Sequence, residues 1–139
     1  MKNYEVYKFV DADGDEKFIF RRPDSARWTK EKIQKRIALF EEMGYELEMY
    51  LKCDADTFFS HKAHATMVKI IRASEMLDKA TTEYHMGLMS LRHFYDYKER
   101  KVKRIGMLTE NFKDIMREMI DRGLEFRDEE IVVFYNRFV

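Results

Sequence analysis

The sequence predicts an α+β fold in which a small, mainly antiparallel sheet packs on short helices and a long central helix serves self-association. Three observations predict this fold. The N-terminal part holds two runs of aromatic and β-branched residues around an aspartate-rich turn. Two segments further along the chain each show a helical pattern, a glycine and then a strand pattern. Between these segments, residues 54–105 contain no proline and a single glycine, Gly87.

Composition indicates one globular domain over residues 1–139. The chain is 45% hydrophobic and 14% aromatic, which is enough to build a core. Its 26 basic and 26 acidic residues cancel, so no overall charge attracts nucleic acid. The single cysteine, Cys53, excludes an intramolecular disulfide, and no apolar run is long enough for a membrane span. We therefore expect a cytoplasmic protein without a membrane partner.

The first element in order is a β-hairpin. Strands are expected at Tyr4–Val10 and 17–21, because both are rich in aromatic and β-branched residues. Residues 11–15 between them contain three aspartates and Gly14, which suggests a calcium loop as an alternative. In an EF-hand the glycine is the sixth of twelve loop residues, whereas here it is the fourth and lies between strands. A hairpin turn is the favoured interpretation.

A helix and a strand follow. Pro23, with Asp24 and Ser25 as candidate caps, opens a helix that Gly44 ends. Alternating apolar and polar residues then predict a strand over 45–52 with one buried face. The apolar residues of the helix share one face and are Trp28, Ile33, Ile37 and Phe40.

The C-terminal segment repeats this order. Thr109 is expected to open a helix with Phe112 on its apolar face, and Gly123 to end it. The apolar, β-branched run at 131–138 predicts a strand that joins the sheet.

The central segment predicts one long helix over about residues 55–104. A continuous helix over 54–105 would be about 78 Å long, against a radius of gyration of about 14 Å for a compact domain of this size. A heptad pattern runs through it, which favours a dimer seam. A break at Gly87 or at Thr81 and Thr82, giving a hairpin, is the alternative, but the unbroken heptad phase favours continuity. The predicted oligomer interface is Met67, Ile70, Ala73, Leu77, Ala80, Tyr84, Gly87, Leu88, Leu91 and Tyr95.

The sequence contains no recognisable catalytic motif. No two glycines are close enough in sequence to build a phosphate-binding loop, and the serine and histidine motifs of common hydrolases are missing. His61 and His64 share a helix face and could hold zinc with Cys53. Capping by Asp54 or Asp56 and burial of the cysteine are the favoured explanation. We therefore assign no catalytic residue, no cofactor and no metal.

Charge is segregated along the chain. Residues 21–36 carry seven basic and two acidic side chains, and residues 92–104 carry six and two with aromatic rings between them. Basic residues beside aromatic rings are what a phosphate and a base require. Residues 41–56 and 110–130 are acidic, and pairing of the basic segments with these acidic segments within a dimer, or simple solvation, is favoured over nucleic-acid binding. If a binding site exists, its candidate residues are Arg92, Tyr95, Tyr97, Lys98, Arg100, Lys101, Lys103 and Arg104.

These observations predict a non-enzymatic protein, most simply a homodimer, that binds and modulates another macromolecule, as regulators and phage-type inhibitors of host systems do. A protein partner is expected. The first alternative is a binder of nucleic acid or a small nucleotide through the basic segment at 92–104. The second alternative is a metal-dependent enzyme centred on His61 and His64.

Overall fold

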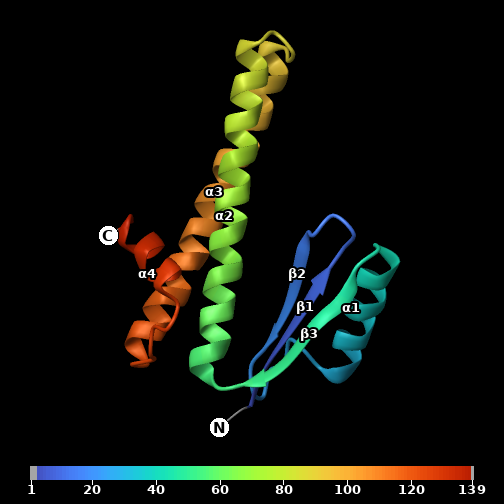
Figure 1. Cartoon of the computed structure of the whole chain (residues 1–139), viewed down its shortest axis with the longest axis vertical. Helices are drawn as coiled ribbons and strands as arrows, with labels where there is room; N and C mark the ends of the chain where they lie inside the picture. The colour runs from blue at the N-terminus through green and yellow to red at the C-terminus, as the bar shows by residue number, and fades with distance from the viewer. Residues whose placement is uncertain (1–2, 139) are drawn as a thin grey trace. The chain divides into compact units, whose positions relative to one another are not determined.

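The computed structural model describes residues 3–138 and divides the chain into two compact units, one ending at His61 and the other beginning at Lys62. Its sheet and helices confirm the predicted α+β class (Figure 1). The elements in chain order are β1 (Tyr4–Val10), β2 (Glu16–Arg21), α1 (Lys30–Glu42), β3 (Glu46–Cys53), α2 (Ala55–His85), α3 (Leu91–Asp121) and α4 (Glu129–Asn136).

The first unit contains an antiparallel sheet in the order β2-β1-β3. The predicted hairpin joins β1 and β2. Asp11 Oδ1 accepts hydrogen bonds from the backbone N–H groups of Asp13 (3.0 Å) and Asp15 (2.8 Å). Gly14 has φ +81°, a conformation that glycine adopts without a steric cost. The aspartates therefore belong to a tight turn between strands.

Helices of this unit cover both faces of β1. Successive side chains of a strand point to opposite faces, so the side chains of β1 contact a helix on each side. On one face, the ring of Phe9 meets that of Phe40 in α1 edge-on, with the centroids 4.9 Å apart. On the other face, Phe58 in the first turn of α2 lies 4.8 Å from Tyr4 and 5.7 Å from Phe20 between ring centroids. The unit therefore has an aromatic core on each side of its sheet.

Helix α1 begins later than the sequence predicted. The predicted cap Ser25 accepts a hydrogen bond from the N–H of Trp28 (3.2 Å), and this turn delays the helix. Thr29 is the N-cap instead, accepting from the N–H of Lys32. Gly44 ends the helix as expected, with φ +88° and its N–H bonded to the carbonyl of Glu41 (3.0 Å).

The predicted continuous helix over about 55–104 is wrong, because α2 ends at His85 and α3 begins at Leu91 (Figure 1). Gly87 has φ +76°, and Leu88 N–H bonds to the carbonyl of Glu83 (2.9 Å), which is a Schellman ending. Ser90 then caps α3. The two helices form an antiparallel hairpin, and Gly87 is a turn residue rather than a packing residue.

The C-terminal predictions also need correction. The expected strand at 131–138 is helix α4, capped by Asp128, which accepts from the N–H of Glu130 (3.0 Å). Phe134 of this helix packs edge-on against Phe112 of α3, with the ring centroids 5.2 Å apart. The β-branched run gave no indication of this contact. Thr109 does not open a helix, since it lies inside α3.

Candidate functional site

The predicted oligomer seam divides into a buried and an exposed part. Four residues of α2 are buried within the chain at 4 to 5% exposure: Met67, Ile70, Ala73 and Ala80. Leu77 and Tyr84 are half-buried. Beyond the turn, the seam residues Leu88, Leu91 and Tyr95 are exposed. Only this second part is available to a partner.

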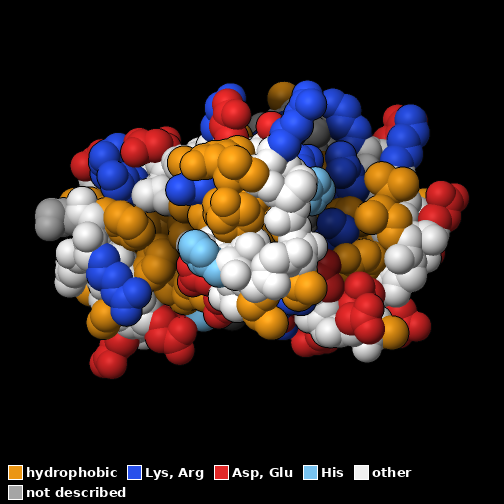
Figure 2. Space-filling model, turned by 90° about the horizontal axis from the view of Figure 1, so that it is seen from above, with side chains coloured by type: hydrophobic (Ala, Val, Ile, Leu, Met, Phe, Trp, Pro, Cys, Tyr) orange, Lys and Arg blue, Asp and Glu red, His pale blue; other side chains and the backbone are white. Residues whose placement is uncertain are grey.

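Apolar side chains gather at the turn between α2 and α3. We call Met86, Leu88, Leu91 and Tyr95 the hairpin end; their exposed fractions are 68, 71, 52 and 58%. Figure 2, which looks onto the turn shown at the top of Figure 1, shows hydrophobic side chains grouped beside histidines. Below the turn, the rings of Tyr84 and Phe94 stack with their centroids 4.6 Å apart, which ties the two helices together.

The structure does not gather the predicted basic residues of α3 into one site. Arg92, Lys98 and Arg104 are six residues apart, so they point in three directions about 120° apart around the helix. Tyr97 and Lys101 are half-buried, and Lys101 Nζ lies 3.8 Å from Met76 Sδ of α2. The other members are exposed: Tyr95, Arg100, whose Nε donates to the carbonyl of Asp96 (3.4 Å), and Lys103, which pairs with Glu99 (3.5 Å).

The structure gives other contacts or surroundings to three residues near the possible zinc site: Asp54, Cys53 and His64. Asp54 Oδ1 accepts from the N–H of Thr57 (3.0 Å) at the start of α2, the capping role that the sequence predicted. Cys53 is buried, and burial raises the pKa of its thiol. His64 Nδ1 lies 3.0 Å from Asp128 Oδ2. Within residues 3–138, no three His, Cys, Asp or Glu side chains lie close enough together to hold a metal ion.

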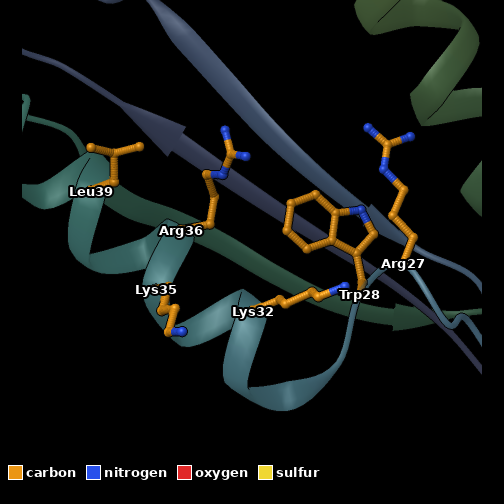
Figure 3. Close-up of a pocket in the computed structure, with 6 residues that line it drawn as sticks. All are labelled: Arg27, Trp28, Lys32, Lys35, Arg36 and Leu39. Carbon is orange, nitrogen blue, oxygen red and sulfur yellow. The ribbon is translucent and has the colours of Figure 1, made fainter.

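A cavity of about 430 Å³ lies beside Trp28, at a place that the sequence did not predict (Figure 3). Arg27 and Trp28 come from the segment before α1. Their partners on α1 are spaced i, i+3, i+4 and i+7 and so share one helix face: Lys32, Lys35, Arg36 and Leu39. The excess of basic residues over 21–36 was the available signal. No signal in the sequence indicated the position of the indole relative to this helix face.

The indole of Trp28 lies between two guanidinium groups (Figure 3). The Cζ atoms of Arg36 and Arg27 are 5.6 and 5.9 Å from the ring centroid, within the range of cation–π attraction. Trp28 also packs against the core of the first unit. The core therefore fixes the indole while part of it remains open to the cavity.

Tyr7, Tyr45 and Tyr50 of the same unit have raised pKa values, and the hydroxyls of Tyr7 and Tyr45 each donate a hydrogen bond to a carboxylate. A hydrogen bond to Asp15 Oδ2 (2.5 Å), together with burial, raises the pKa of Tyr45 to about 12. Burial and a hydrogen bond to Glu5 raise the pKa of Tyr7. Both phenols stay protonated near neutral pH, so they act as hydrogen-bond donors and not as bases.

Comparison with known proteins gives no relative: no family model, no curated protein and no solved structure matches this chain. Across residues 3–138, every helix is too short or too polar to cross a membrane.

Proposed function

We propose that the chain is a non-enzymatic, cytoplasmic interaction protein that forms a homodimer through the hairpin end and, as that dimer, binds and modulates another macromolecule. The exposure of four large apolar side chains around one turn carries the proposal. Single exposed apolar residues are ordinary on protein surfaces, whereas grouped ones mark places where proteins meet.

The hairpin end is suited to docking because its support is rigid. Tyr84 and Phe94 stack beneath it, and the Gly87 turn is closed by backbone hydrogen bonds. A partner therefore meets side chains that are already in place, which lowers the entropy lost on binding. Full burial of one leucine contributes about 1.5 to 3 kcal/mol. Leu88 and Leu91 together can thus supply much of the free energy of a weak dimer.

Charges beside the hairpin end favour a second copy as the partner. Glu83 lies in the last turn of α2 and Arg92 in the first turn of α3. Neither side chain forms an ion pair within the part of the chain that the structure describes. A two-fold contact brings the same surface of two copies together. It can therefore set Glu83 of each copy against Arg92 of the other.

Sedimentation equilibrium over a range of micromolar concentrations tests the proposal. The unmodified chain should be a dimer, and the double variant Leu88→Gln with Leu91→Gln should raise the dissociation constant by about a hundredfold, near tenfold for each leucine. Ile120→Gln is the matched control, because Ile120 is as exposed as Leu91 at 52%. A monomeric mass at every concentration, or a double variant that dimerises like the parent, would contradict the proposal.

A charge exchange tests the two-fold arrangement. Glu83→Arg and Arg92→Glu should each weaken the dimer, because each places like charges opposite one another. The two changes combined should restore much of the affinity. If the combined variant is weaker than both single variants, the two residues do not face each other across the contact.

A further inference from the structure

The cavity beside Trp28 belongs to the first unit, and its chemistry is independent of the hairpin end. Its lining contains four cationic side chains, a tryptophan and a leucine, and no acidic residue. Its volume of about 430 Å³ is in the range of small-molecule sites, roughly 300 to 1,000 Å³. Such a volume is larger than a single inorganic anion requires.

The positive charges of the cavity are only partly neutralised. Lys35 pairs with Glu31 at 3.7 Å, in an exposed and therefore weak contact. Arg27, Lys32 and Arg36 form no ion pair with any residue in the range 3–138. Like charges held close together repel one another, so an anion entering the cavity is attracted by several charges at once. Planar guanidinium groups match the oxygens of a phosphate.

The tryptophan favours an anion that carries an aromatic base. Its indole offers an aromatic surface beside the cations, and stacking on such a surface stabilises a bound base by about 1 to 3 kcal/mol. The indole N–H donates no hydrogen bond to any group in residues 3–138. The flanking guanidinium carbons, at 5.6 and 5.9 Å, are near the outer limit of cation–π contact. A base can therefore replace one guanidinium over the ring while that group turns toward the phosphate.

We propose that this cavity binds one phosphorylated nucleoside, with the base against the indole of Trp28 and the phosphate held by Arg27, Lys32 and Arg36. The ligand is either a free nucleotide or one nucleotide of a single strand, which share this chemistry. The proposal goes beyond the dimerisation proposed above, since no residue of the hairpin end takes part in it.

Intrinsic fluorescence provides a direct test, because Trp28 is the only tryptophan of the chain. AMP, GMP, CMP and UMP should be titrated in turn, with adenosine and inorganic phosphate as partial ligands. At least one nucleotide should quench the emission with saturation. Adenosine should bind at least tenfold more weakly than AMP, and phosphate should compete with AMP. Absence of saturable quenching by all four nucleotides, or equal binding of adenosine and AMP, would overturn the proposal.

Two substitutions distinguish nucleotide binding in the cavity from general electrostatic attraction to the protein. Arg36→Gln should weaken nucleotide binding about tenfold to a hundredfold, because a hydrogen bond to a charged group is lost. Lys52→Gln, at an exposed position on β3 of the same unit, removes the same charge and should change binding less than twofold. Equal losses in the two variants would show that the cavity is not the site. Circular dichroism confirms that each variant is folded.

A short single-stranded oligonucleotide distinguishes the two sources of ligand. If it binds Trp28 much more tightly than the mononucleotide, and Arg36→Gln weakens both, the site recognises a nucleotide within a strand. If the mononucleotide binds as tightly as the oligonucleotide, the ligand is the free nucleotide. Strand binding that Arg36→Gln leaves unchanged would overturn the proposal.

Discussion

The rings of Tyr84 and Phe94 stack across the turn that joins α2 and α3, with their centroids 4.6 Å apart and their planes only 9° from parallel. Tyr84 belongs to the last turn of α2 and Phe94 to the first turn of α3. The contact therefore fixes the hairpin at the point where the chain reverses. Aromatic pairs contribute about 0.5 to 1.5 kcal/mol beyond the burial of their surface.

Removing this contact should destabilise the hairpin. Phe94 is only 7% exposed, so Phe94→Ala should lower the free energy of unfolding by about 3 kcal/mol through the cavity and the lost stacking. Urea denaturation measures the change. Val102→Ala, at a 51% exposed position on the same helix, is the control and should stay within about 0.5 kcal/mol of the parent. Similar losses in both variants would mean that the two rings do not pack in solution.

Two glycines of the hairpin should respond in opposite ways to alanine. Gly87→Ala should destabilise by about 1 kcal/mol, because φ +76° is strained for a residue with a Cβ. Gly106 lies inside α3, and a Cβ added there meets nothing within 4 Å. Gly106→Ala should therefore stabilise by about 0.5 to 1 kcal/mol. Thermal unfolding of both variants decides this, and a destabilised Gly106→Ala would contradict a helix that continues through residue 106.

The first unit could be predicted well from local signals, because these signals agree with its tertiary contacts. Gly14, Gly44 and the aromatic and β-branched residues of β1 each predict the conformation that the structure shows. The heptad pattern failed at Gly87. Five residues, 86–90, separate the helices, and the apolar spacing happens to continue across them. The spacing of apolar residues alone cannot distinguish two helices joined by such a turn from one continuous helix.

The C-terminal error and the missed cavity have different causes: the first depends on a contact between residues far apart in sequence, whereas the second depends on the local fold of residues 27–39. The β-branched run at 131–133 favours a strand, but the cap at Asp128 and the packing of Phe134 on Phe112 favour a helix. The basic residues near Trp28 were visible as a charge excess. Their grouping around the indole depends on how the segment before α1 folds.

Alkaline pH should weaken the first unit. The pKa of Tyr45 is raised to about 12 by its hydrogen bond to Asp15 and by burial, whereas an unfolded tyrosine has a pKa of about 10. The folded state therefore holds the proton more tightly, and its stabilisation is complete below about pH 10. It is lost as the pH rises from about 10 to about 12. Tyr7, whose pKa is also raised, adds to this loss.

Urea unfolding at several pH values, combined with tyrosinate absorbance, tests this expectation. Tyr45→Phe should reduce the fall in stability over that range. Asp15→Asn should bring the pKa of Tyr45 back toward 10, because the carboxylate acceptor is lost. If Tyr45 ionises in the parent near pH 10, the hydrogen bond to Asp15 does not form in solution.

Asp128 caps α4 with one carboxylate oxygen and contacts α2 with the other. Its Oδ1 accepts from the N–H of Glu130 (3.0 Å), and its Oδ2 lies 3.0 Å from His64 Nδ1. Because a carboxylate only accepts, the Nδ1 atom of His64 carries the hydrogen in this pair. Asp128→Ala removes both contacts and should cost about 1 to 2 kcal/mol, the usual loss for an N-cap. Asp128→Asn retains a capping oxygen and should cost less.

Amide hydrogen exchange at residues 131–136 reports on this helix directly. Asp128→Ala should reduce protection there more than Asp128→Asn does. Asp114→Ala is the control, because within residues 3–138 Asp114 forms only an exposed pair with Arg117 (3.2 Å). This substitution should change the free energy of unfolding by less than about 0.5 kcal/mol. Unchanged protection in Asp128→Ala would mean that α4 is held by Phe134 on Phe112 alone, and that the His64 contact adds nothing.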